Sequence, residues 1–206
     1  MEALLMDTAS AVDARRLLAR WVFATFWGWL LGFVFMMAGA ITADLAMGAE
    51  RAQFFIGLGM GAGIGYAQAR VTSQFLGIGD RWGWLTVAGM GAPFIMADLL
   101  RIAGIGLPFF PSIWLCASCG GLLVGLLQHP LLRRHGSRAR WWVAASLAGW
   151  LLAGATPLLY GTLLGIGPGA VAAVINIGAI LLGGAVLGVV TGATLVWVLP
   201  AEPHAA

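Results

Sequence analysis

Residues 121–150 have the sequence GLLVGLLQHPLLRRHGSRARWWVAASLAGW. The segment begins with an apolar stretch that contains Gly121 and Gly125, and it ends with a second apolar stretch that begins at Trp141. A short segment rich in arginine joins the two stretches. Because arginine is enriched in the cytoplasmic loops of membrane proteins, this pattern predicts two antiparallel membrane-spanning helices joined by a cytoplasmic turn.

The composition of the whole chain also indicates a membrane protein. The 206 residues are 61% hydrophobic and 9% charged, with a mean hydropathy of +0.94. Soluble domains contain roughly 25% charged residues. From Trp141 to Ala201 the chain contains no Asp, Glu, Lys or Arg, and this stretch is long enough for two spans of ~20 residues. These features exclude an ordinary soluble domain and predict an all-α membrane protein.

Six membrane-spanning helices fit the apolar segments of the chain. Residues 1–19 carry acidic groups and lack the apolar core of a secretory signal, so we expect an amphipathic helix on the cytoplasmic membrane surface. Residues 200–206 are expected to form a short cytoplasmic tail. The six expected spans, which together form one bundle over 20–199, are 20–43, 52–76, 82–105, 111–132, 141–163 and 170–199.

The arginines predict the orientation of these spans. All eleven basic residues are arginines, and a cytoplasmic N-terminus puts every one except Arg51 and Arg101 on the cytoplasmic side. The arginines flank apolar segments and do not form a clustered basic face, so the sequence does not indicate a nucleic-acid partner. Three spans begin with an arginine followed by a tryptophan, which predicts tryptophans at the cytoplasmic interface. These pairs are Arg20-Trp21, Arg81-Trp82 and Arg140-Trp141.

The chain also contains an internal repeat. A shift of 60 residues aligns Gly61, Gly65 and Gln68 with Gly121, Gly125 and Gln128, and a further shift of 63 adds Gly184, Gly188 and Thr191. Tryptophans with a glycine seven residues later occur at Trp21, Trp82 and Trp142. The repeat predicts three tandem helical hairpins, at about 20–80, 81–140 and 141–199, related by a pseudo-threefold axis along the membrane normal.

The repeated glycines and polar residues fall on one face of each returning helix, at positions i, i+4 and i+7. In lipid, helices associate through small residues and interhelical hydrogen bonds, so the six glycines are predicted to be helix-packing positions. Gln68, Gln128 and Thr191 have two interpretations. They form hydrogen bonds between helices, or they form a polar collar around a central path.

These motifs resemble those of a group of uncharacterised bacterial multi-pass membrane proteins. In that group a Gly-x-x-x-Gly-x-x-Gln segment precedes Leu-Arg-Arg and then Trp-Trp-Val-x-Ala-x-x-x-Gly-Trp. The chain departs from this pattern in its first repeat, where Ser73-Gln74 replaces the two arginines, and in its third, where Thr191 replaces glutamine. The resemblance implies an architecture of hairpin repeats and no known activity. The matching residues are Gly121, Gly125, Gln128, Leu132, Arg133, Arg134, Trp141, Trp142, Val143, Ala145, Gly149 and Trp150.

Asp98 and Arg101 form an oppositely charged i, i+3 pair inside a predicted span. At 1.5 Å per residue, Asp98 lies ~24 Å from Trp82, near the outer edge of the hydrocarbon core. The first interpretation is a structural ion pair, with Arg101 extending to the outer headgroups. The second is a role with a substrate or a proton, because charged groups inside membranes are often functional. Pro93 is expected to kink the same helix.

Two further motifs suggest a cofactor. Cys116 and Cys119 form Cys-x-x-Cys inside a predicted helix, where they are either small packing residues or a redox pair linked to a quinone. His129 follows Gly125 by four residues, a spacing that permits contact with a chlorin or haem. Its other interpretation is a hydrogen-bonded histidine at the interface. Two thiols cannot complete a zinc site, and no metal is expected.

The sequence lacks the hydrolase, metalloprotease and phosphate-binding motifs, so we expect no enzymatic activity. The leading hypothesis is a packing or accessory subunit of a larger complex in the bacterial inner membrane, in contact with lipid and with other integral membrane subunits. One alternative is a small-solute transporter or channel that uses the polar collar and Asp98. Another is a subunit that contacts a chlorin, haem or quinone.

Overall fold

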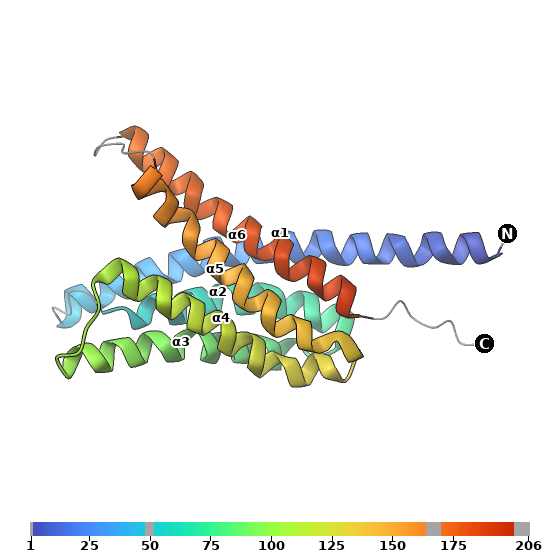
Figure 1. Ribbon diagram of the computed structural model, residues 1–206, viewed down its shortest axis with the longest axis horizontal. Coiled ribbons are helices and arrows are strands. Elements are labelled where there is room, and N and C mark those ends of the chain that lie inside the picture. Colours follow the sequence, from blue (N-terminus) through green and yellow to red (C-terminus); the bar gives the residue numbers. More distant parts are fainter. Residues whose placement is uncertain (1, 48–51, 164–169, 200–206) are drawn as a thin grey trace.

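The computed structural model describes the backbone of residues 2–47, 52–163 and 170–199, and the side chains of 14–45, 52–109, 111–156 and 174–199 apart from 176. These residues form six α-helices and one short 3-10 helix, which confirms the all-α prediction (Figure 1). The helices are α1 (Glu2–Met47), α2 (Phe54–Leu76), α3 (Gly79–Ile102), α4 (Phe109–Arg133), η1 (Ser137–Ala139), α5 (Arg140–Leu163) and α6 (Ala170–Val198).

Two glycines with left-handed backbone end helices. Gly77 has φ 66° and its N–H donates to the Ser73 carbonyl, so α2 stops and α3 begins two residues later. Gly104 has φ 80°, and α3 ends before it at Ile102. The left-handed conformation is accessible to glycine because it has no Cβ. The third predicted span, 82–105, is therefore shifted toward the N-terminus by three residues.

The helices form a closed ring. Each packs against its neighbours in the sequence, from α1 to α6, and α6 also packs against α1. Figure 1 shows α1 to α4 running side by side, whereas α5 and α6 cross them obliquely and diverge from the bundle at the ends that lie near residues 163 and 170.

Within the described residues, four helical segments are long and apolar enough to cross a membrane. This finding supports a membrane protein with transmembrane helices. The predicted spans 52–76 and 141–163 are not among the four. α2 carries five glycines between Gly57 and Gly65 and a polar half that begins at Gln68, and in α5 the side chains of 157–163 lie outside the described residues. The four segments are Ala14–Leu45, Gly79–Ile102, Pro111–Arg133 and Ile177–Val198.

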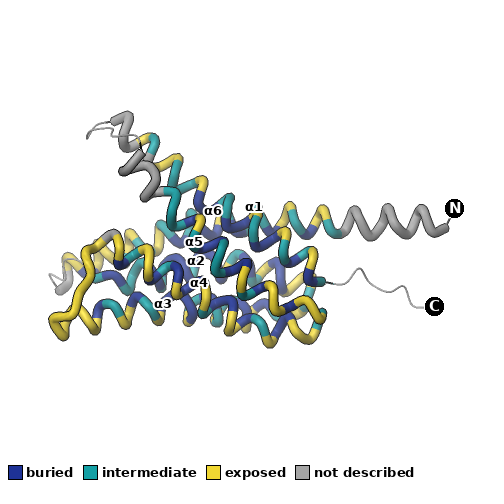
Figure 2. The backbone as a smooth tube through the Cα atoms, viewed as in Figure 1, coloured by how far each residue is buried: buried dark blue, intermediate teal, exposed yellow. Residues whose placement is uncertain are grey.

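Polar and apolar side chains are distributed as expected for a bundle in lipid. Many large apolar side chains are exposed, among them Trp84 and Leu45, at 74% and 82%. Figure 2 shows exposed residues recurring along the helices. Many of the hydroxyl and amide side chains lie inside. Since lipid provides no hydrogen-bond partners, polar side chains in a membrane are satisfied only within the bundle. The buried polar residues near the bundle axis include Thr25, Gln68, Thr86, Gln128, Ser146 and Thr191.

The two predicted terminal segments have different outcomes. Residues 2–19, expected as a separate surface helix, are continuous with the first span in α1, and Figure 1 shows this part of α1 extending past the other helices. Leu17 and Arg20 already lie against the bundle, because Leu17 is buried in its core and Arg20 contacts Gln74 on α2. The predicted tail at 200–206 lies outside the described residues.

Candidate functional site

Trp21, Trp82 and Trp142 meet inside the bundle, towards the end that carries Arg20 and Arg81, and form a tryptophan core. Their ring centroids are 5.7, 5.9 and 5.2 Å apart, and each pair has an edge-to-face geometry. All three residues are almost completely buried.

Trp21 and Trp82, predicted at the cytoplasmic interface, therefore lie inside the bundle and not on its lipid-facing surface, whereas Trp141 is 48% exposed. Their depth in the membrane stays a prediction. An indole has an apolar ring and one N–H donor. Inside the bundle the rings pack edge to face, and each N–H has a hydrogen-bond acceptor, so burial leaves neither the ring nor the N–H without a partner.

Each indole of the tryptophan core donates a hydrogen bond to one of the predicted collar residues. The donor lies on an odd-numbered helix, and the acceptor lies on an even-numbered one. In two cases the acceptor helix directly precedes the donor helix, and in the third α6 provides the acceptor for α1. The three bonds are Trp21 Nε1 to Thr191 Oγ1 at 2.9 Å, Trp82 Nε1 to Gln68 Oε1 at 3.1 Å and Trp142 Nε1 to Gln128 Oε1 at 3.0 Å.

The two glutamines make a second bond with their amide nitrogens. Gln68 Nε2 donates to Thr25 Oγ1 at 3.1 Å, and Gln128 Nε2 donates to Thr86 Oγ1 at 2.9 Å. Each glutamine thus connects two different odd-numbered helices. Thr191 is too short for this bridge, and its hydroxyl donates to the Leu187 carbonyl at 2.6 Å. Ser146, which lies four residues after Trp142, donates to the Gly121 carbonyl at 2.7 Å.

The structure therefore brings Gln68, Gln128 and Thr191 together around the tryptophan core. Their side-chain polar atoms make hydrogen bonds with neighbouring helices, as the first interpretation of these residues requires. The indole rings occupy the centre at this level, where the collar interpretation requires a path. The contacts favour hydrogen bonds between helices as the role of the three residues.

The six predicted packing glycines face neighbouring helices at close range. A Cβ on Gly61, Gly121 or Gly184 would lie within 3.1 Å of the Cβ of Met90, Trp150 or Trp29, respectively. A Cβ on Gly65, Gly125 or Gly188 would lie within 3.3 Å of the Cβ of Thr86, Ser146 or Thr25. These contacts join α2 to α3, α4 to α5 and α6 to α1. Glycine permits the backbones to approach closely enough for the hydrogen bonds around the tryptophan core.

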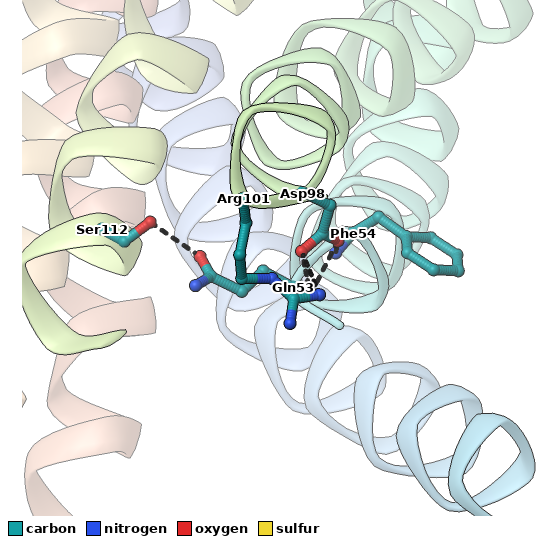
Figure 3. Close-up of polar contacts among 5 residues, drawn as sticks. All are labelled: Gln53, Phe54, Asp98, Arg101 and Ser112. Carbon is teal, nitrogen blue, oxygen red and sulfur yellow. Dashed lines mark hydrogen bonds and ion pairs between the residues drawn. The ribbon is translucent and has the colours of Figure 1, made fainter. Parts of the chain in front are cut away.

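Asp98 caps the beginning of α2, a contact that sequence reasoning missed (Figure 3). Its carboxylate accepts bonds from the backbone N–H of Gln53, at 2.8 and 3.0 Å, and from that of Phe54, at 2.8 Å. The first N–H groups of a helix lack partners within the helix, and the Gln53 side chain does not cap α2. No Ser, Thr, Asp or Asn stands directly before Phe54. This absence is the one feature of the sequence that could have indicated a cap from another part of the chain.

The same carboxylate pairs with Arg101, whose Nη2 lies 3.3 Å from Asp98 Oδ1. Ser112 Oγ on α4 donates to Gln53 Oε1 at 2.9 Å. These bonds connect α2, α3 and α4 at the end of the bundle opposite Arg133. The predicted ion pair is present in the structure, and it belongs to a larger polar network (Figure 3).

A groove of about 640 Å³ lies beside this network, between α3 and α4, and we call it the outer groove. Its polar side chains, Gln53, Arg101 and Ser112, gather near one end. The rest of its wall is mostly apolar and includes both cysteines. The lining residues are Gln53, Ala92, Pro93, Met96, Ala97, Leu100, Arg101, Ile105, Gly106, Leu107, Ser112, Leu115, Cys116, Cys119 and Leu123.

The candidate cofactor residues do not converge on one site. Cys116 is buried and its thiol lies 3.5 Å from the Pro93 carbonyl, whereas Cys119 is exposed, and both thiols are free. His129 lies half-buried near the other end of α4, next to the buried Gln128. Any redox or pigment role of these residues stays a prediction.

Comparisons with known proteins provide no family for the chain. No family profile matches it, and neither does any curated protein or solved structure. Its function is therefore inferred from the tryptophan core, the Asp98 cap and the outer groove.

Proposed function

We propose that this chain is a non-enzymatic subunit of the bacterial inner membrane that packs, as an accessory component, against other integral membrane subunits. In this proposal all six helices span the membrane as three tandem hairpins around a pseudo-threefold axis. The accessory role depends on this architecture.

The equivalent contacts around the tryptophan core support the pseudo-threefold arrangement. The tryptophan hydrogen bond and the two glycine contacts occur between α2 and α3, between α4 and α5, and between α6 and α1. Gly89 on α3 and Gly149 on α5 also pack in the same way, against Val124 and Leu187 of the returning helices. Contacts of the same type at the same repeat positions are expected of a hairpin present three times.

Helix lengths support six spans. α2 has 23 residues and α5 has 24, which at 1.5 Å per residue corresponds to about 35 Å, enough for a ~30 Å hydrocarbon core. Each packs between two helices that are apolar enough to cross a membrane. The arginine-rich end of the bundle, which includes Arg20, Arg81 and Arg133, supports a cytoplasmic position for that end and for both termini.

The main support for a non-catalytic role is that the polar side chains inside the bundle bind other helices. Gln68, Gln128 and Thr191 make hydrogen bonds to other helices, and Asp98 caps α2. A catalyst or transporter needs polar groups that face a substrate site or a path. Groups that already stabilise helix contacts fit a protein whose role is structural.

The outer half of α6 supports contact with a further subunit. This half diverges from the main bundle (Figure 1), and it exposes Val174, Ile177 and Leu182. Gly178 lies among them, and a Cβ there would have no atom of another described helix within 4 Å. A small residue on an exposed apolar face permits close approach of a helix from another membrane protein.

Purification from native membranes in a mild detergent tests this proposal. We expect one or more integral membrane proteins to co-purify, and we expect Gly178→Leu to reduce their recovery. Val189→Leu is the matched control, because Val189 is also exposed on α6 and already has a branched side chain. A chain that remains an isolated monomer in every mild detergent would contradict the proposal.

Two further measurements separate this proposal from the alternatives. Solute flux in liposomes that disappears in Gln128→Leu, while the bundle stays folded, would favour the transporter. Visible absorption bands in the purified protein that disappear in His129→Ala would favour the cofactor subunit. We expect neither result.

A further inference from the structure

We propose that the outer groove binds a glycerophospholipid, with its phosphate against Arg101 and one acyl chain along the wall between α3 and α4. The inference does not depend on the accessory role, because it rests on the shape and polarity of the groove itself.

The groove has the length of one lipid leaflet. Its α4 wall extends from Ser112 to Leu123, eleven residue steps that correspond to about 16 Å. This length is about half of the ~30 Å hydrocarbon core. Its volume of about 640 Å³ lies within the usual range for ligand sites. An acyl chain of the same leaflet therefore fits along the groove.

The polarity of the lining matches that of a phospholipid. Met96, Leu100, Leu115 and Leu123 provide apolar walls, and Arg101 lies at the end where α3 finishes. A ligand in this groove thus meets apolar atoms along most of its length and a cation at one end. A phospholipid has the same division between an acyl chain and an anionic phosphate.

Arg101 is held in place and still has donors for a phosphate. Asp98 accepts one bond from its Nη2 at 3.3 Å, which uses one of the five N–H donors of a guanidinium. The Arg101 side chain is 40% exposed, whereas the Asp98 side chain is 11% exposed and also accepts the bonds of the α2 N-terminus. The planar guanidinium can bind a phosphate in a bidentate manner.

Small side chains explain why the groove is open between two packed helices. Ala92 and Ala97 lie on its α3 side, and Cys119 lies on its α4 side. A larger residue at any of these positions would fill part of the space. Pro93 directly follows Ala92 and has no backbone N–H, so α3 has one fewer donor here. The Pro93 carbonyl contacts the Cys116 thiol.

Photo-cross-linking of the full chain in galactolipid vesicles, whose host lipid carries no phosphate, tests the assignment. The probes are phosphatidylglycerol with a photoreactive group on one acyl chain and diacylglycerol with the same chains and no phosphate. Adducts are mapped by mass spectrometry of peptides from α3 and α4. We expect the phosphatidylglycerol probe to label the groove residues, and an excess of unlabelled phosphatidylglycerol to reduce this labelling.

Arg101→Gln is expected to reduce phosphatidylglycerol adducts in the groove by about tenfold, the range of a charge-assisted hydrogen bond, without changing diacylglycerol adducts. Arg70→Gln is the control, because Arg70 is exposed near the other end of the bundle, where it bonds to Tyr66. Ala92→Trp should reduce the adducts of both probes, whereas Ala40→Trp, on an exposed face of α1, should leave them unchanged.

Equal labelling of all lipid-facing helices would overturn the assignment of the groove. Equal groove labelling by both probes, with no effect of Arg101→Gln, would overturn the assignment of the phosphate. The Arg101→Gln comparison remains decisive if Ala92→Trp fails to fold, since Arg101 is an exposed residue. Co-purification of partner subunits is measured separately and does not affect either result.

Discussion

The indole nitrogen of Trp21 donates a hydrogen bond to Thr191, which lies 170 residues later in the chain. This contact joins α1 to α6 and closes the ring of helices. Glycines at the same interface, Gly184 and Gly188, bring α6 close to Trp29 and Thr25. The first and last helices are therefore held together by the same types of contact that join α2 to α3 and α4 to α5.

Trp21→Phe should destabilise the bundle more than Trp29→Phe. Both changes remove a similar part of a buried side chain, but Trp21 loses its bond to Thr191, whereas Trp29 Nε1 is buried without a hydrogen-bond partner among the described residues. We expect a difference in unfolding free energy of about 1–2 kcal/mol, measured by reversible unfolding in bicelles. Equal effects would show that the Trp21 hydrogen bond contributes little.

Gln128→Leu should lower the unfolding free energy by about 1–3 kcal/mol, since it removes two interhelical hydrogen bonds and keeps a similar volume. Trp142 Nε1 and Thr86 Oγ1 each lose a buried partner. Gln74→Leu is the control, because Gln74 is exposed and bonds only to Arg20 in the described contacts. A Gln128 variant as stable as the control would contradict the bridging role.

Gly125→Ala should destabilise the contact between α4 and α5 by about 1–3 kcal/mol, because a Cβ there would lie 2.9 Å from the Val143 Cα. Gly178→Ala is the matched change on an open helix face, and it should leave stability unchanged or raise it by up to about 1 kcal/mol through helix propensity. The unfolding free energies of both variants provide the test. A stabilised Gly125→Ala variant would mean that α4 and α5 are not closely packed.

Asp98→Ala should open the first turn of α2, because the amides of Gln53 and Phe54 lose their acceptor. We expect these amides to lose about 1–3 kcal/mol of protection, measured by hydrogen exchange of peptides that cover residues 52–60. The control is Asp80→Ala, an exposed carboxylate in the first turn of α3. This change should lower the protection of the first-turn amides of α3 by only ~0.3–1 kcal/mol, the usual effect of a charge near a helix N-terminus. Unchanged exchange in Asp98→Ala would contradict the cap.

Cysteine labelling in intact bacteria should reveal the orientation. In a chain with Cys116→Ala and Cys119→Ala, Ala103→Cys is expected to react with a membrane-impermeant maleimide, because it lies in the connection after α3 on the proposed outer side. Ser137→Cys, in the arginine-rich turn between α4 and α5, should react only after the cells are opened. The reverse pattern would place the arginine-rich end outside.

Much of the fold was predictable because hydropathy and glycine spacing are local signals. The α4 helix, Phe109–Arg133, differs from the predicted span 111–132 by no more than two residues at either end. Gly121 and Gly125 were predicted to pack against another helix, and they face Trp150 and Ser146. Such positions can be read from sequence because small residues at four-residue spacing have few other uses in lipid.

Other contacts depend on the three-dimensional arrangement. Trp82 next to Arg81 has the same local pattern as an interfacial tryptophan, and only the packing of the helices shows that its ring is buried against Trp21 and Trp142. Asp98 caps a helix whose N-cap, Gln53, is 45 residues away in the sequence. The outer groove forms because several side chains that face each other between α3 and α4 are small. No single residue in the sequence indicates that such a groove exists.

The closed ring has a consequence for the order in which the protein forms. During synthesis α1 enters the membrane first, but the acceptor of its Trp21 indole, Thr191, is made only with the last helix. An N–H group without a partner in lipid costs several kcal/mol. A nascent chain that stops before α6 therefore carries an unsatisfied indole donor, and the contact that closes the ring forms only once the final helix has been made.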